Sequence, residues 1–199
     1  MIVKNKFIFY LLSWTWGIIM TAIGGIIAAG LLIAGYKPKK HGHCIYFEVG
    51  KGWGGVELGM FFLTSKDAGK STRNHEHGHG FQNTVLGPAF PFLVAIPSAT
   101  RYWLRECSDR KSKTIFSVIL YLALITIAAI LLVTALYTQP WVFIFPIFIA
   151  LYATILFGWL IIIEIPKYDK GYVDYDAIWF EGSATKLGDE FMSTFDKNN

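Results

Sequence analysis

The sequence predicts a mainly α-helical membrane protein with about three transmembrane helices, a proline-rich re-entrant segment, a small β-hairpin and a helix with an HExxH motif. Three observations lead to this fold class. Hydrophobic residues make up 54% of the 199 residues and charged residues only 16%, which is too apolar for an ordinary soluble domain. Three uncharged stretches are long enough to cross a bilayer. The length fits a single membrane-embedded domain over 1–199.

The first uncharged stretch covers residues 7–35. It exceeds the roughly 20 residues that a helix needs to cross the hydrocarbon core, but it is too short for two crossings. It is also longer than the apolar region of a signal peptide and lacks a clear cleavage site. We therefore expect one retained, tilted span.

The other two uncharged stretches, 115–137 and 141–163, are separated by only three residues. So short a connection predicts an antiparallel helical hairpin over 115–163. Charged segments flank both outer ends of this hairpin. By the positive-inside rule, these ends lie on the cytoplasmic face of the membrane.

The segment after the first span is the least membrane-like part of the chain. Residues 44–49 and 56–64 are rich in aromatic and branched side chains and flank the glycine-rich GKGWGG, which predicts a β-hairpin over 44–64. Good helix-capping residues then follow, namely Ser71, Thr72 and Asn74.

The capping residues predict that a helix begins near residue 72. Within 72–104, the apolar part 81–104 contains Pro88, Pro91 and Pro97. Because proline removes a backbone donor and clashes with the preceding turn, a helix here must bend or break. We expect a re-entrant or interfacial segment, or a badly kinked span.

Residues 75–79 read His-Glu-His-Gly-His and contain the pattern His-Glu-x-x-His. Four residues apart on a helix, His75 and His79 share a face and can both bind one zinc ion. Zinc lowers the pKa of a bound water toward about 7, and Glu76 can accept the proton, which is the chemistry of peptide hydrolysis. Glycines within this helix suggest that another segment approaches it closely.

A zinc site of this kind needs a further ligand on a separate element. The best candidate is Glu181, on a predicted helix over 172–188, where it shares a helix face with Ala184 and Thr185. His41 and His43 form a His-x-His pair and are reserve donors.

Tyr175, His77 and Arg73 are candidates for stabilising an oxyanion. His77 projects from the opposite side of the helix to His75, so we expect it to be a polar surface residue.

The arrangement of HEHGH and a later WFEGSAT resembles the gluzincin-type HExxH zinc metallopeptidases, in which a glutamate on a later helix completes the zinc site. More narrowly, GGVELGMFFL, HEHGHGFQNTVLGPAFPFLVAIPS and YDAIWFEGSATKLG are similar to a group of small bacterial membrane proteins of unestablished function, with HExxH and a late Glu-x-x-Ala segment. Gluzincins often have aspartate where Thr185 stands, and a hydroxyl supports a zinc-bound histidine less well than a carboxylate.

Membrane topology restricts where the ligands can meet. HExxH and Glu181 can meet only if residues 81–104 dip into the membrane and return. The site then lies at the cytoplasmic face of a bacterial membrane and the N-terminus outside, because the lysines of 37–40 lie inside. Lys4 and Lys6 argue against this orientation.

The leading functional hypothesis is a membrane-bound zinc endopeptidase that cleaves peptides or membrane proteins near the lipid bilayer. One alternative is a non-catalytic membrane interaction or immunity protein with a structural or vestigial metal site. Another is a zinc-dependent lipid amide hydrolase. The net charge of +4 does not indicate nucleic-acid binding, because the basic residues lie at the edges of apolar runs.

Overall fold

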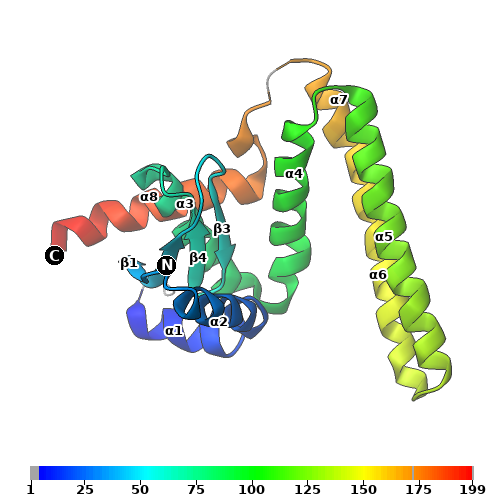
Figure 1. The fold of residues 1–199 in the computed structure, drawn as a ribbon, viewed down its shortest axis with the longest axis horizontal. Coiled ribbons are helices and arrows are strands. Elements are labelled where there is room, and N and C mark those ends of the chain that lie inside the picture. Colours follow the sequence, from blue (N-terminus) through cyan, green and yellow to red (C-terminus); the bar gives the residue numbers. More distant parts are fainter. Residues whose placement is uncertain (1–4, 172, 199) are drawn as a thin grey trace. The chain divides into compact units, whose positions relative to one another are not determined.

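The computed structural model describes residues 5–171 and 173–198, and the chain divides into two compact units (Figure 1). We call Met1–Ile96 with Asp174–Asn199 the site unit, and Pro97–Val173 the hairpin unit. The site unit combines helices with a small sheet, and the hairpin unit is helical in its described part.

The sheet of the site unit has four strands in the order β1-β2-β4-β3. The pair β2–β4 is parallel, whereas β1–β2 and β3–β4 are antiparallel. The strands are β1 (Lys39–His41), β2 (Cys44–Glu48), β3 (Gly55–Leu58) and β4 (Phe61–Thr64).

The predicted hairpin between residues 44–49 and 56–64 is therefore wrong. Two tight turns that begin with glycine explain the difference. Gly42 between β1 and β2 has φ +56°, and Gly59 between β3 and β4 has φ +77°. Glycine adopts positive φ without steric cost, and it favours two-residue hairpin turns at this position. Each stretch thus belongs to a hairpin of its own, and the two hairpins pair through β2 and β4.

The HExxH motif lies on helix α3 (Lys70–Leu86), which packs against helix α8 (Trp179–Asn198). The 3-10 turn η6 (Tyr175–Ala177) precedes α8. The predicted capping residues lie inside α3, whose N-cap is Gly69. Asn74 instead joins neighbouring elements. Its side-chain oxygen accepts from His41 Nε2 at 2.8 Å, and its side-chain nitrogen donates to Asp189 Oδ1 at 2.7 Å.

The predicted span over residues 7–35 is not one continuous helix. It consists of α1 (Lys6–Trp14) and α2 (Ile18–Ile33), which meet at an angle of 89°. The break lies against α3, where the Asn83 amide donates to the Gly17 carbonyl at 3.3 Å. A side chain at residue 17 would collide with that amide. The bend is therefore set by packing as well as by local sequence.

Two apolar clusters hold the site unit together. The first joins α1, the sheet, α3 and α8 through Phe9, Cys44, Tyr46, Phe62, Phe81, Phe191 and Met192. The second joins α2, β3, the segment after α3 and the start of α8 through Met20, Leu58, Phe90, Val94 and Phe180. Burial of these side chains fixes α3 and α8 against a common sheet.

The proline-rich segment is interrupted by non-α turns, as its prolines predict, and it stays helical in type. α3 ends at Leu86 and is followed by the 3-10 turn η2 (Gly87–Ala89), the π-helical turn η3 (Pro91–Ala95) and α4 (Ile96–Glu106). Gly87 has φ +53° and ends α3. Such non-α turns are common where proline interrupts the regular bonding pattern.

The hairpin unit contains the predicted antiparallel helix pair, in which α5 (Arg110–Leu136) packs along α6 (Ile144–Trp159) (Figure 1). The turn η4 (Pro140–Phe143) begins the second arm, and η5 (Leu160–Glu164) and α7 (Ile165–Tyr168) extend it. The segments Arg110–Leu136 and Trp141–Tyr168 are long and apolar enough to cross a membrane. They extend about five residues beyond the predicted 115–163 at each outer end.

Candidate metal centre

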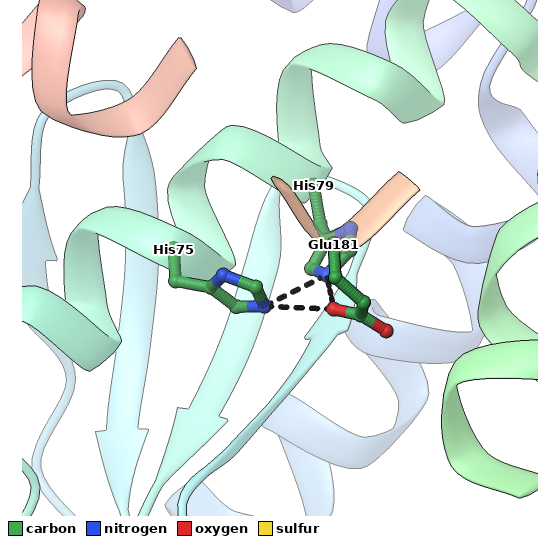
Figure 2. A group of neighbouring side chains, drawn as sticks. All are labelled: His75, His79 and Glu181. Carbon is green, nitrogen blue, oxygen red and sulfur yellow. Dashed lines mark hydrogen bonds and ion pairs between the residues drawn. The ribbon is translucent and has the colours of Figure 1, made fainter. Parts of the chain in front are cut away.

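Three potential metal ligands converge between α3 and α8. Figure 2 shows His75 and His79 projecting from α3 toward the Glu181 carboxylate on α8. The two Nε2 atoms lie 3.0 Å apart, and Glu181 Oε2 lies 3.1 Å from His75 Nε2 and 3.2 Å from His79 Nε2. Among the described residues, these three form the one His/Cys/Asp/Glu group arranged to hold a metal ion. The three ligands predicted from the sequence thus lie together.

The spacing of these atoms fits a tetrahedral metal. Ligands about 2.05 Å from a tetrahedral zinc lie roughly 3.3 Å from one another, close to the separations of 3.0 to 3.2 Å observed here. Two imidazole nitrogens and a carboxylate oxygen repel one another at this distance unless a proton or a cation lies between them. The donor set and its geometry therefore suit a small divalent ion.

A second layer of hydrogen bonds orients the two imidazoles. His79 Nδ1 lies 2.7 Å from Gln82 Oε1. The Gln82 amide nitrogen donates to the Phe180 carbonyl at 2.6 Å and to Ser183 Oγ at 2.7 Å. Because a carbonyl only accepts, these bonds set the orientation of the amide and make His79 Nδ1 the donor. In the neutral imidazole, Nε2 is then the nitrogen with the free lone pair, and it faces the site, as a metal ligand requires.

His75 is supported in the same way by the residue predicted for that role. Its Nδ1 lies 2.8 Å from Thr185 Oγ1, one helical turn after Glu181 on α8. Sequence reasoning did not assign Gln82 a role. The available signal was its position three residues after His79 on the same helix, where side chains meet.

Glycines allow α3 and α8 to approach closely enough for Glu181 to reach the histidines. A Cβ at Gly78 would overlap the backbone of Ala184, and a Cβ at Gly188 would overlap the backbone of Asn74. Each helix thus presents a glycine to the other helix's backbone. The expectation that another segment approaches the motif helix closely is confirmed at Gly78.

Glu76 is buried beside the three ligands. Its carboxylate lies against β3, where a Cβ at Gly55 would come within 2.6 Å of Glu76 Oε1. Burial raises the pKa of Glu76, while the nearby His75 and His79 act to lower it. For His75, burial acts to lower the pKa, but the hydrogen bond to Glu181 and nearby carboxylates outweigh it and the pKa is raised. Glu76 thus has the higher proton affinity that suits a general base near neutral pH.

A further buried carboxyl, Glu57, was not predicted. It lies on β3 two residues after Gly55, so it faces the same side of the strand. Its Oε1 accepts from the Gly59 N–H at 2.6 Å. Burial raises its pKa well above the usual range, and the Glu76 carboxylate adds to the effect. The sequence signal for a buried Glu57 was its position on the inward face of an apolar strand.

Tyr175 is the predicted oxyanion candidate whose ring lies near a potential metal ligand, His75. Its ring centroid lies 6.1 Å from that of His75. Arg73 donates to the Ala68 carbonyl at 2.9 Å and lies over the Tyr46 ring. Its guanidinium is therefore engaged outside the site, and the expectation for Arg73 is not supported by its contacts.

The expectation that His77 lies on the polar surface is wrong. His77 does project away from His75, but its ring is fully buried among Phe9, Phe81 and Phe191. Its Nε2 accepts the His43 backbone N–H at 3.1 Å. Phe9 and Phe191 come from distant parts of the sequence, so the helix position alone did not reveal that they cover His77.

The reserve ligands His41 and His43 also lie in this second histidine group. Their ring centroids are 6.2 Å and 6.0 Å from that of His77, and neither belongs to the metal-ligand group. Burial lowers the pKa of His77 to about 3, with smaller contributions from His41 and His43. The group is a packed aromatic core rather than a ligand set.

The low pKa of His77 predicts acid sensitivity. Below about pH 6.5 the unfolded state binds a proton on His77 that the folded state excludes. The free energy of unfolding is therefore highest above that pH, and it falls as the pH drops toward about 3. Between pH 6.5 and 5 this loss is about 2 kcal/mol. His77→Phe should remove that part of the pH dependence, as measured by urea unfolding of metal-free protein in detergent.

A matched core variant controls for simple loss of packing. Phe81→Leu removes a contact of the His77 ring without removing a titratable group. It should lower the free energy of unfolding by a similar amount at both pH values. The same pH dependence in His77→Phe as in wild type would contradict the assignment.

The site as a whole is a largely buried group of three potential metal ligands. Glu181 is fully buried, whereas the His75 side chain is 14% exposed. Two nitrogen donors and one carboxylate are a common protein ligand set for a catalytic zinc ion. No family model, curated protein or solved structure matches the chain.

Proposed function

We propose that this chain is a membrane-bound, zinc-dependent hydrolase that cleaves peptide bonds, with Glu76 as the general base. The observation that carries the proposal is the convergence of His75, His79 and Glu181 beside a buried glutamate. Three protein ligands leave a fourth position for water or substrate, as in catalytic zinc sites. The resemblance to gluzincin-type metallopeptidases points in the same direction.

The residues divide the chemistry among them. His75, His79 and Glu181 would hold the zinc, which when bound lowers the pKa of a coordinated water toward about 7 and polarises a carbonyl. The Glu76 carboxylate accepts a proton from the attacking water and returns it to the leaving amine. Thr185 and Gln82 keep the two imidazoles in the orientation that the ligands need.

The sheet favours a peptide over a lipid amide as substrate. β3 lies at the edge of the sheet, and its Gly55 lies against Glu76. An extended peptide can pair with the free side of an edge strand, which would bring its backbone past the base. A lipid amide offers no matching ladder of backbone groups.

The proposed location is the bacterial cytoplasmic membrane, with the metal centre facing the cytoplasm. Two segments of the hairpin unit are long and apolar enough to span a bilayer. Their outer ends adjoin the basic segments 105–113 and 167–170, which the positive-inside rule places in the cytoplasm. Substrates would be peptides or membrane proteins close to the bilayer.

Metal analysis tests the proposal directly. Purified wild-type protein should carry about one zinc per chain and cleave peptides, and a chelator should stop cleavage. His75→Ala should lack both properties because it removes a ligand. His41→Ala is the matched control and should keep both, since His41 lies outside the ligand group. A metal-free wild type, or equal zinc loss in both variants, would overturn the proposal.

A further inference from the structure

The bent helix pair α1–α2 exposes a large apolar surface on the site unit. A single stripe of α2 is buried, and it includes Met20, Thr21, Gly24 and Ala28. The exposed large apolar side chains of the pair are Phe7, Leu11, Trp14, Trp16, Ile18, Ile19, Ile23, Ile26, Ile27, Leu32 and Ile33. So large an apolar surface marks an interaction site, and its aliphatic composition suits lipid tails.

Neither helix is long enough to cross a bilayer. α1 has 9 residues and α2 has 16, so they are about 14 Å and 24 Å long, against a hydrocarbon core of about 30 Å. Because the two axes meet at 89°, only one of them can point along the membrane normal.

Side-chain contacts bring the two ends of the pair back together. Phe9 and Tyr10, in the middle of α1 and within about 6 Å of axial rise from its first residue, contact His43, which follows α2 by ten residues. The ring centroids are 5.5 Å apart for Phe9–His43 and 6.3 Å apart for Tyr10–His43. The chain that leaves α2 therefore returns to the side from which α1 started.

The returning segment cannot lie in hydrocarbon. Between α2 and His43 it contains Lys37, Lys39 and Lys40, all exposed, and Lys39 forms an ion pair with Glu48 at 2.7 Å. Each lysine at the bilayer centre costs about 2.5 to 3.5 kcal/mol. Three of them hold this segment in water, so α1 begins and α2 ends on one aqueous side.

The helix pair α1–α2 also packs against the sheet. A Cβ at Gly24 of α2 would overlap the backbone of Leu58, at the turn end of the β3–β4 hairpin. Figure 1 shows α1 and α2 (blue) along the lower edge of the site unit, beneath the ends of these strands. The polar Gly50–Gly54 loop and Glu76 lie toward the other end of the hairpin.

We propose that Lys6–Ile33 is a re-entrant element that enters and leaves the lipid bilayer on one side and seats the site unit on the membrane surface. The N-terminus then shares the compartment of the metal centre, in contrast to the crossing predicted from the sequence. Lys4 and Lys6 join the lysines of 37–40 on that side, which removes their conflict with the positive-inside rule. This topology goes beyond the proposed hydrolase function and does not depend on it.

Cysteine labelling of the full chain tests the topology. The parent carries Cys107→Ser and keeps Cys44, which is buried. Single cysteines replace Lys6, Lys37, Lys66 or Gln139, which are all exposed. A membrane-impermeant maleimide applied to intact cells should label only the Gln139 variant, at the hairpin tip. The other three should react only after permeabilisation.

Every outcome of the labelling bears on the proposal. Labelling of Lys6→Cys and Lys37→Cys from opposite sides would show a broken span and overturn it. A nitroxide at Ile26→Cys, in vesicles of phosphatidylethanolamine and phosphatidylglycerol, gives a second measurement. It should collide with oxygen in preference to a nickel chelate, whereas one at Lys66→Cys should show the reverse, and a water-like result at Ile26 would also overturn the proposal. Neither measurement requires activity, so an inactive but correctly inserted protein separates this inference from the hydrolase proposal.

Discussion

Glu76→Gln should lower peptide cleavage by roughly 10²- to 10⁴-fold, the range that general-base catalysis contributes. The amide keeps the size of the side chain, so it still fits against Gly55. It cannot accept the proton of the attacking water, however. Zinc content should stay at the wild-type value, because Glu76 is not among the three converging ligands. Cleavage of a quenched peptide library and metal analysis of the same preparation measure both effects.

The matched control for this variant is Glu190→Gln. Glu190 lies on α8, as Glu181 does, but its side chain is 50% exposed and its partner Lys186 is 4.0 Å away. An exposed pair of this kind contributes little to stability, so cleavage and zinc content should both match wild type. If Glu76→Gln kept zinc and full cleavage, Glu76 would not be the base. If neither variant nor wild type cleaved peptides while zinc stayed bound, the structural-metal alternative would be favoured.

The three potential metal ligands could be predicted because their signals are local. His75 and His79 are related by one turn of a single helix, and Glu181 stands among small residues on a second helix that its own sequence predicts. The hairpin unit was predictable for the same reason, because an uncharged stretch of about 20 residues specifies a spanning helix without knowledge of its neighbours.

The features that sequence reasoning missed depend on distant partners. His77 is buried because Phe9 and Phe191 cover it, and those residues are far from it in the sequence. The break between α1 and α2 lies where Asn83 meets Gly17. The parallel pairing of β2 with β4 likewise follows from tertiary packing, since local pattern specifies strands but not their partners.

Gly78→Ala should separate α3 from α8 and weaken zinc binding. The added methyl overlaps the Ala184 backbone, which cannot rotate away as a flexible side chain can. Alanine favours a helix by about 1 kcal/mol over glycine, but overpacking a buried contact costs about 1 to 3 kcal/mol. Any shift of α8 also moves Glu181 away from the histidines. Thermal unfolding in detergent with a chelator, and zinc titration against a competing chelator, measure the two effects.

Gly30→Ala provides the comparison that isolates the contact. Gly30 lies inside α2, and apart from the adjoining residues and backbone of that helix, no heavy atom of the described structure lies within 4 Å of an added Cβ there. The gain in helix propensity then stands alone, so this variant should be as stable as wild type or slightly more stable and should bind zinc normally. If Gly78→Ala behaved like Gly30→Ala, α3 and α8 would have to lie farther apart than the structure places them. Glu181 could not then complete the metal centre, and the third ligand would have to come from another residue.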